Sequence, residues 1–260
     1  MAQPARDLRR EGHLKSMLAI IGGTGLTQLS NLDVSRRQVV RTPYGEPSGP
    51  LTFGVIRGVT VVFLARHGYG HTIPPHQVNY RANLWALKEQ GVGDIVSVVS
   101  VGGIRADLGP GRIVVPHQII DYTCGRMNTF FENEAPVKHI DFTEPYTGEL
   151  RSRLLTAAKA CGEAAVDGAV YAATQGPRLE TAAEIDRLER DGADIVGMTG
   201  MPEAALAREI ELAYAAIAVV VNHAAGRGAS AHGVRLQEID EVLRDAVGRV
   251  RRIIEALVAA

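Results

Sequence analysis

Three short apolar runs of this sequence each end in glycines and hydrogen-bond donors. The segments concerned are Gly22–Gly25, Arg66–His71 and Ser100–Gly103. Bare backbone N–H groups, a threonine hydroxyl and a planar guanidinium all suit an oxyanion such as phosphate. In an α/β sheet, ligand-binding groups collect beyond the carboxyl ends of the strands. We therefore expect the three segments to converge on one bound anion.

Each of these signals also has a purely structural interpretation. The Gly22–Gly25 loop has no further glycine at Gln28 and no Gly-Lys-Ser/Thr, so it fits neither a dinucleotide loop nor a Walker loop and is equally a tight strand exit. Arg66 could instead pair with a carboxylate. The glycines between His67 and His71 disfavour a helix, so these two histidines are not an i, i+4 metal pair, and we predict no metal site.

Three polar residues stand where other apolar runs meet loops. Glu180 stands at the start of a predicted helix, Thr199 precedes another, and Asn222 ends the long apolar run near the C-terminus. Glu180 could simply favour the positive end of its helix, Thr199 could be a helix cap or an anion ligand, and Asn222 could be a turn residue. The local sequence leaves both interpretations of each residue open.

The elements that would position these groups alternate along the chain. Apolar runs without polar alternation predict strands covered on both faces, and apolar residues at helical spacing predict helices. The expected strands are 17–21, 61–65, 95–101, 113–120, 170–174 and 214–221, and the expected helices are 78–90, 179–190 and 236–258. We therefore predict an α/β fold in a single domain, with a central mixed β-sheet flanked by helices.

Composition restricts the classes of partner. The 260 residues are 46% hydrophobic, and 28 Lys+Arg against 29 Asp+Glu give a formal net charge of -1. Such a chain can bury a full-sized core but has no global field that would gather a nucleic acid or an anionic membrane. No apolar run approaches the roughly 20 residues of a membrane span.

The cysteines indicate the cellular compartment, and the polar segments indicate where the folded domain begins and where its longest loop lies. Cys124 and Cys161 have no metal-ligand spacing and form no disulfide framework, which favours a reducing cytoplasm. Residues 1–16 are polar, and we expect them to be a disordered extension before a domain at 17–260. The irregular, polar stretch 121–146 is the longest expected loop, long enough to reach a neighbouring molecule.

In their order and spacing, seven motifs resemble the trimeric purine nucleoside phosphorylase and methylthioadenosine phosphorylase family. They are Ile20–Leu26, Thr42–Gly45, Ala65–Gly68, Val78–Asn83, Val101–Ile104, Gly176–Thr181 and Met198–Glu203. The resemblance spans residue 17 to the C-terminus, and around Pro75–Leu87 it is most like the bacterial methylthioinosine phosphorylase branch. It implies a nucleoside phosphorylase-like fold, a homotrimer with sites at subunit interfaces, and reversible attack of inorganic phosphate on C1′ of a purine nucleoside, with no cofactor.

The resemblance also implies roles for individual residues. Met198 lies along the ribose, and Asn222 donates toward N7 as the departing purine gains electrons. The catalytic set is Asn222, His67 and Thr199. Phosphate is held by Thr24, Arg66, His67, Thr199 and the backbone near Ser100 and Val101.

Hydrogen bonding predicts which base is accepted. A 6-oxopurine carries an N1–H that an ionised Glu180 can accept, whereas the N1 lone pair of adenine would face the carboxylate and leave it unpaired. Glu180 therefore favours hypoxanthine or guanine over adenine.

The 5′ end of the nucleoside is predicted from the start of the last helix. Ordinary purine nucleoside phosphorylases place a histidine there for the 5′-hydroxyl, and the matching residues here are Leu236 and Ile239, which suit a methylthio group. These two residues could equally be the core face of the helix, and His232 or His223 could still reach a hydroxyl. By the same resemblance, His139 in the long loop enters the pocket of a neighbouring subunit.

The first hypothesis is therefore conversion of 5′-methylthioinosine and phosphate to hypoxanthine and 5-methylthioribose 1-phosphate. The alternatives within the class are an inosine or guanosine phosphorylase and, less favoured, a methylthioadenosine phosphorylase. Outside the class they are a nucleoside-binding module without turnover and a nucleoside hydrolase, which would require a metal or paired carboxylates that the sequence does not show.

Overall fold

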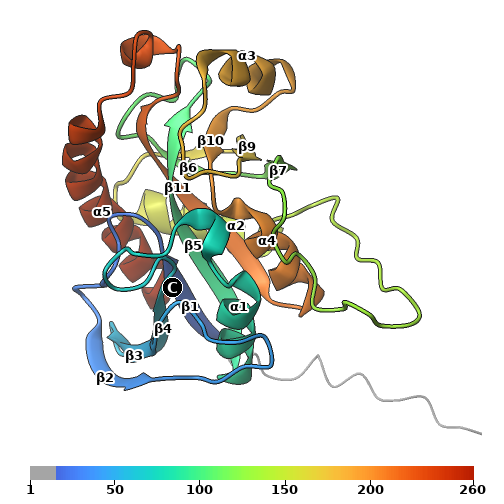
Figure 1. Ribbon diagram of the computed structural model, residues 1–260. Coiled ribbons are helices and arrows are strands. Elements are labelled where there is room, and N and C mark those ends of the chain that lie inside the picture. Colours follow the sequence, from blue (N-terminus) through green and yellow to red (C-terminus); the bar gives the residue numbers. More distant parts are fainter. Residues whose placement is uncertain (1–15) are drawn as a thin grey trace, which may run out of the picture.

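Parallel strands form the centre of the sheet. In the computed structural model, which describes residues 16–260, β1 (Met17–Gly22) lies between β4 (Val59–Ala65) and β5 (Val92–Gly103) and runs parallel to both. β11 (Ala213–His223) pairs in parallel with β5 on its other side. The carboxyl ends of these four strands therefore meet at one edge of the sheet (Figure 1).

Shorter strands extend this centre on both sides. These strands are β2 (Asp33–Gln38), β3 (Leu51–Ile56), β6 (Ile113–Val115), β7 (Gln118–Asp121), β8 (Ala165–Asp167), β9 (Val170–Ala173) and β10 (Ile195–Gly197). Antiparallel strands β2 and β3 continue from β4, and β10 pairs antiparallel with β5 and leads through β9 to β7, so the sheet is mixed. The helices are α1 (Tyr80–Glu89), α2 (Gly148–Ala160), α3 (Ala182–Arg190), α4 (Gly200–Glu209) and α5 (Leu236–Ala259), with short 3-10 helices at Pro75–Gln77 and Gly228–Ser230.

Helices cover both faces of the sheet (Figure 1). On one face, Leu18 and Ile20 of β1 belong to the same buried cluster as apolar residues of α2 and α5, such as Ile254. On the other face, Ala19 and Ile21 belong to a cluster with residues of α1 and α4. Successive residues of a strand point to opposite faces of the sheet, so both the odd-numbered and the even-numbered residues of β1 must be apolar. The predicted α/β class with a flanked mixed sheet is confirmed.

Several element boundaries differ from the predictions. The expected strand 113–120 is two strands, β6 and β7, separated at Pro116, which has no N–H to donate to a ladder. The expected helix 78–90 begins at Tyr80 because the side chain of Asn79 accepts the backbone N–H of Ala82 at 3.1 Å. The expected helix 179–190 begins at Ala182, so Glu180 lies outside it.

The long loop joins β7 to α2. Residues 122–147 contain no helix or strand and extend away from the sheet (Figure 1). The predicted extension 1–16 lies outside the described residues apart from Ser16, so its disorder and the boundary at residue 17 stay predictions. Among residues 16–260, no helix is long and apolar enough to cross a membrane.

Candidate active site

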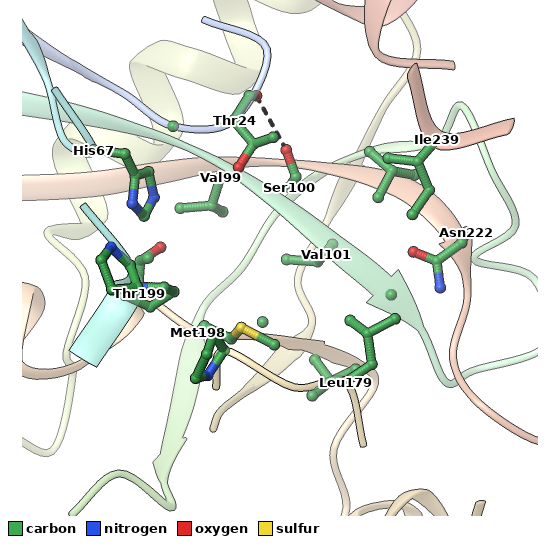
Figure 2. A pocket seen from close by; sticks show the side chains of 18 of the residues that line it. Thr24, His67, Val99, Ser100, Val101, Leu179, Met198, Thr199, Asn222 and Ile239 are labelled. Atoms are coloured by element: carbon green, nitrogen blue, oxygen red, sulfur yellow. Dashed lines mark hydrogen bonds between the residues drawn. The ribbon is translucent and has the colours of Figure 1, made fainter. Parts of the chain in front are cut away.

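A cavity of about 600 Å³ opens where the carboxyl ends of β1, β4, β5 and β11 meet. Its size is typical of a small-molecule site. In the view of Figure 2, Thr24, His67 and Thr199 lie toward one end of this cavity and Asn222 toward the other. The structure brings ten of the predicted site residues to its wall: Thr24, Arg66, His67, Ser100, Val101, Glu180, Met198, Thr199, Asn222 and Ile239.

Two predicted site residues are not part of this wall. Leu236 is the first residue of α5 and is 62% exposed, whereas Ile239, one turn later, and Val234 line the cavity. The structure therefore places the Leu236 side chain in solvent and outside the cavity wall of its own chain, although residues on either side of it in the sequence line that wall. His139 is exposed on the long loop, outside the cavity of its own chain, and its role toward a neighbouring subunit stays a prediction.

Glycines allow the first loop to lie directly against β5. A Cβ at Gly23 would stand 2.7 Å from the carbonyl oxygen of Val98, and one at Gly22 would stand 2.1 Å from the carbonyl oxygen of Leu26. Real side chains do not tolerate either distance, so the turn requires glycine for structural reasons alone. The same close packing carries Thr24 over the cavity, where its carbonyl accepts a hydrogen bond from Ser100 Oγ at 3.3 Å (Figure 2).

Arg66 is fully buried and paired with Glu203. Arg66 Nε and Nη2 donate to the two carboxylate oxygens of Glu203 at 2.7 and 2.9 Å, Nη1 donates to Val98 O at 3.1 Å, and Nη2 donates to Ser97 Oγ at 2.6 Å. A guanidinium has five N–H groups, so one N–H on Nη1 is left for an anion. The expectation that Arg66 offers its fork to phosphate needs correction, because the carboxylate occupies the fork.

Arg66 nevertheless keeps its positive charge. Burial disfavours the charged form, but the charge of Glu203 and its hydrogen bonds outweigh burial and raise the pKa of Arg66. Glu203 Oε1 also accepts hydrogen bonds from Ser97 Oγ and Tyr214 Oη, each at 2.8 Å. Sequence reasoning assigned no role to Glu203. The available signal was a glutamate within the otherwise apolar start of α4.

His67 has one fixed tautomer. Its Nδ1 donates to the carbonyl oxygen of Ile73 at 2.8 Å, and the residue is only 5% exposed. Burial and the positive charge of Arg66 lower the pKa of His67 from 6.5 to about 4. The ring is therefore neutral at pH 7, and its Nε2 is an acceptor. The expected second donor to phosphate is instead a group that accepts a hydrogen bond from a protonated phosphate oxygen or a sugar hydroxyl.

Thr199 stands at the N-cap position of α4 but makes no side-chain capping bond. Its backbone N–H donates to Tyr171 Oη at 3.3 Å, and the residue is 7% exposed at the cavity wall. A side-chain cap is therefore not its role in this structure. The backbone at Met201 is not helical (φ -119°, ψ 140°), so the regular part of α4 begins after it, and the Thr199 hydroxyl is a donor at the cavity wall rather than part of the helix end.

The helix cap expected near Glu180 is formed by other residues. Thr181 Oγ1 accepts the backbone N–H of Glu184 at 3.1 Å, and the Glu184 carboxylate accepts the backbone N–H of Thr181 at 2.7 Å. Glu180 is half-buried in the cavity wall, and its Oε1 accepts a hydrogen bond from Thr174 Oγ1 at 2.6 Å. The carboxylate is thus held outside the helix and faces the cavity.

Asn222 follows an irregularity in β11. The register between β11 and β5 shifts between Val220 and Asn222, so β11 carries an extra residue at this point. Such a bulge re-aims side chains at the end of a strand. Asn222 lines the cavity, and its Nδ2 donates to the carbonyl oxygen of His223 at 2.6 Å. Among residues 16–260, no group of three or more His, Cys, Asp or Glu side chains could hold a metal ion.

The lowered pKa of His67 predicts a specific pH dependence of stability. The unfolded chain takes up this proton near pH 6.5 and the folded chain only near pH 4. The neutral ring therefore stabilises the folded state fully above pH 6.5, and this stabilisation is lost as the pH falls toward 4. We expect the free energy of unfolding, measured in urea, to lose up to about 3 kcal/mol more over this range in wild type than in His67→Gln. Parallel curves for the two proteins would contradict the assignment.

Removing one member of the buried ion pair should be costly. Glu203→Ala leaves the Arg66 guanidinium uncompensated, and we expect the free energy of unfolding to fall by about 3 to 5 kcal/mol. The matched control is Glu134→Ala, which removes an exposed pair with Lys138 and should cost less than about 1 kcal/mol. Equal losses in the two variants would show that burial does not govern this interaction.

The chain is similar to known phosphorylases over nearly its whole length. A probable S-methyl-5′-thioinosine phosphorylase of Pseudomonas syringae pv. tomato is 54% identical over 94% of this chain and 99% of that protein. The 6-oxopurine nucleoside phosphorylase of Pyrococcus furiosus is 47% identical over 80% of each. The solved structure of methylthioadenosine phosphorylase from Schistosoma mansoni in complex with adenine has a TM-score of 0.90 and 35% identity, covering 94% of this chain and 91% of that one. Residues 17–259 match the phosphorylase superfamily, and the chain belongs to that family as a pentosyltransferase of the phosphorylase type.

Proposed function

We propose that this chain catalyses the reversible phosphorolysis of a 6-oxopurine nucleoside, with 5′-methylthioinosine as the preferred substrate. The products are hypoxanthine and 5-methylthioribose 1-phosphate. The observation that carries the proposal is a carboxylate, Glu180, that faces the same cavity as the Thr24, His67 and Thr199 cluster. The names of the similar proteins, S-methyl-5′-thioinosine phosphorylase and 6-oxopurine nucleoside phosphorylase, support it.

Phosphate binding in this proposal relies mainly on neutral donors. The hydroxyls of Thr24 and Thr199 and the backbone N–H groups near Ser100 surround the anion, together with the one remaining N–H of the charged Arg66. His67 Nε2 accepts a hydrogen bond from the protonated phosphate oxygen. Phosphate then attacks C1′ as the bond from C1′ to the purine breaks, and no covalent enzyme intermediate forms. Catalysis comes from positioning the anion under the sugar. Phosphate is a co-substrate, and no cofactor takes part.

Asn222 assists the leaving group at the other end of the cavity. Negative charge arrives on the imidazole side of the purine as the bond to C1′ breaks. An amide N–H directed at N7 stabilises this charge in the transition state more than in the ground state. The bulge in β11 holds Asn222 at the cavity wall, which supports this role.

Base selection follows from the hydrogen bonds of Glu180. Thr174 already occupies Oε1, and Oε2 is free to accept N1–H of a 6-oxopurine. Adenine would turn its N1 lone pair toward the carboxylate, and a site with buried polar groups left unpaired can discriminate by about 10⁴-fold or more. This argues against methylthioadenosine as the substrate, although the solved relative named above is a methylthioadenosine phosphorylase.

The 5′ substituent meets an apolar wall. Val234 and Ile239 line the cavity, whereas His223 and His232, the alternative partners for a 5′-hydroxyl, do not. This arrangement supports a methylthio group over a hydroxyl. Inosine and guanosine are the second candidate substrates.

A homotrimer in the cytoplasm completes the proposal. In it, His139 of one chain enters the cavity of the next, which is consistent with its exposure on the long loop. The exposed apolar residues Met127 and Val137 of the same loop would be covered in such an assembly.

A substrate panel tests the reaction itself. We expect free hypoxanthine from 5′-methylthioinosine only when phosphate is present, with kcat/KM at least about 10-fold above that for inosine because the wall around Ile239 is apolar. Hypoxanthine release without phosphate would identify a hydrolase. Binding without release would identify a module without turnover, and a preference for inosine would overturn the 5′ assignment.

Substituting Glu180 tests base selection. A glutamine at this position can accept N1–H through its oxygen or donate its NH₂ to the adenine N1. We therefore expect Glu180→Gln to lower the ratio of kcat/KM for methylthioinosine over methylthioadenosine by about 100-fold. The control, Glu134→Gln, changes an exposed carboxylate of the long loop and should leave the ratio unchanged. An unchanged ratio in Glu180→Gln would remove Glu180 from base recognition.

A further inference from the structure

Arg126, in the long loop, has six acceptors within hydrogen-bond distance of its five N–H groups, so two of the acceptors share one N–H of Nη1, and none of the six is a carboxylate. The residue is half-buried and lies beside the Tyr80 ring, with its guanidinium carbon 5.6 Å from the ring centroid. Its hydrogen bonds run from Nε to Gln175 Oε1 (3.1 Å), from Nη1 to Tyr80 Oη (3.3 Å), Met198 O (2.8 Å) and Met201 O (2.5 Å), and from Nη2 to Thr174 O (3.2 Å) and Gln175 O (2.9 Å). The reaction proposed above assigns no role to this side chain.

The acceptors belong to two segments that carry site residues. Thr174 and Gln175 follow β9 and lead to Glu180, whereas residues 198–201 follow β10 and include Met198 and Thr199. β9 and β10 are parallel neighbours, so both segments leave the sheet at the same edge. Beyond that edge the carbonyl groups have no ladder partners and need other donors. The planar fork of Arg126 supplies these donors to both segments at once and fixes their separation.

Thr174 connects this clamp to the base-reading carboxylate. Arg126 Nη2 donates to the Thr174 carbonyl, and Thr174 Oγ1 donates to Glu180 Oε1 at 2.6 Å. Thr174 is absent from the wall of the nucleoside cavity and lines a separate cavity on the other side of Glu180. Thr174 Oγ1 also lies 3.2 Å from the carbonyl oxygen of Gly197 in the cavity wall, but the Thr174 N–H already donates to that oxygen at 2.7 Å. The shorter bond to the Glu180 carboxylate is therefore the main route by which the hydroxyl can act on the substrate.

We infer that Arg126 and Thr174 are positioning residues for base selection: Arg126 holds the Thr174 backbone, and the Thr174 hydroxyl aims the Glu180 carboxylate at the N1 position of the purine. The inference rests on the function proposed above. It makes base selection depend on three residues joined by hydrogen bonds, Arg126, Thr174 and Glu180, instead of on Glu180 alone. Because Arg126 belongs to the long loop, it also makes the discrimination between bases depend on the conformation of that loop.

Thr174 gives the cleaner test because its side chain does not reach the cavity wall. In Thr174→Val, we expect the ratio of kcat/KM for methylthioinosine over methylthioadenosine to fall about 10-fold or more, the scale of one hydrogen bond to a charged group. The change should appear mainly in KM. Thr174→Ser, which restores the hydroxyl, should return the ratio to within about 3-fold of wild type.

A matched control separates positioning from stability. Thr129→Val removes a threonine hydroxyl that donates to the Glu209 carboxylate at 2.8 Å and also accepts the Phe131 N–H at 3.0 Å, at a place outside the cavity. We expect it to lower the denaturation midpoint at least as much as Thr174→Val and to leave the ratio unchanged. An unchanged ratio in Thr174→Val, or an equal loss of ratio in Thr129→Val, would overturn the inference.

Arg126 is tested by Arg126→Met and Arg126→Lys. We expect Arg126→Met to lower the ratio as Thr174→Val does and also to raise KM for phosphate, because residues 198–201 lose their donor. Lysine keeps the charge but not the fork, so it should restore less than half of the loss on a logarithmic scale. The control, Arg208→Met, removes an arginine that donates to the carbonyls of Asp141 and Glu144 in the same loop. A loss of ratio in Arg208→Met equal to that in Arg126→Met would overturn the role of Arg126.

Calorimetric titration with free hypoxanthine and free adenine makes the result independent of turnover. If the wild-type chain prefers hypoxanthine and Thr174→Val reduces that preference about 10-fold or more, the inference holds even where the proposed reaction fails. Should Arg126→Met not fold, Thr174→Val decides alone. If wild type cleaves methylthioinosine with phosphate and Thr174→Val keeps the full preference in both assays, the inference is wrong and the proposed function stands.

Discussion

The buried pair of Arg66 and Glu203 is the interaction on which the site depends. It joins the end of β4 to the start of α4 and gathers Ser97 of β5 and Tyr214 of β11 around one carboxylate. Breaking such a pair leaves a buried charge with no compensation, so the four elements cannot separate independently. The pair also cancels its own charge directly beside the proposed phosphate position. In the proposed function, phosphate affinity therefore comes mainly from backbone N–H groups and hydroxyls rather than from net positive charge.

The neutral state of His67 has two causes, burial of the ring first and the neighbouring cation of Arg66 second. Both oppose a positive charge on the ring and lower its pKa. A site whose charges cancel holds an anion through the placement of its hydrogen-bond donors. An attack on C1′ requires such placement of the anion. On the opposite wall, Glu180 keeps its carboxylate free of the helix cap because Thr181 and Glu184 satisfy that helix end between themselves. The two ends of the cavity are thus specialised by local hydrogen bonding, with different chemistry at each.

The sequence predicted the parts of the site that follow from strand order. Thr24, His67 and Ser100 could be placed together because parallel strands share one carboxyl edge. Glu203, Arg126 and Thr174 were not found, since their partners lie far away in sequence or are backbone carbonyls that carry no sequence signal; Arg66 and Glu203 are 137 positions apart. Leu236 was assigned from its match to a family position, and such a match does not say which way a side chain points; in this chain it is exposed and only Ile239 lines the cavity. Among the elements, β2 was missed because its residues are mostly exposed and polar, whereas α2 buries Leu150, Leu154, Ala157 and Ala158 at a helical spacing that could have been detected.

The extra residue in β11 changes how many side chains one strand can give to the cavity. In a regular strand, neighbours point to opposite faces, so only every second residue can reach the same wall. Val221 and Asn222 are consecutive, yet both line the cavity. The apolar side chain of Val221 and the amide of Asn222 thus lie side by side at the proposed purine end of the cavity, and both come from one strand. The shift in register lies after Val220. The residue at 222 therefore lies outside the regular alternation by which the earlier residues of β11 pack into the core. Chemistry at the strand end can therefore change through single substitutions while the buried part of β11 stays as it is.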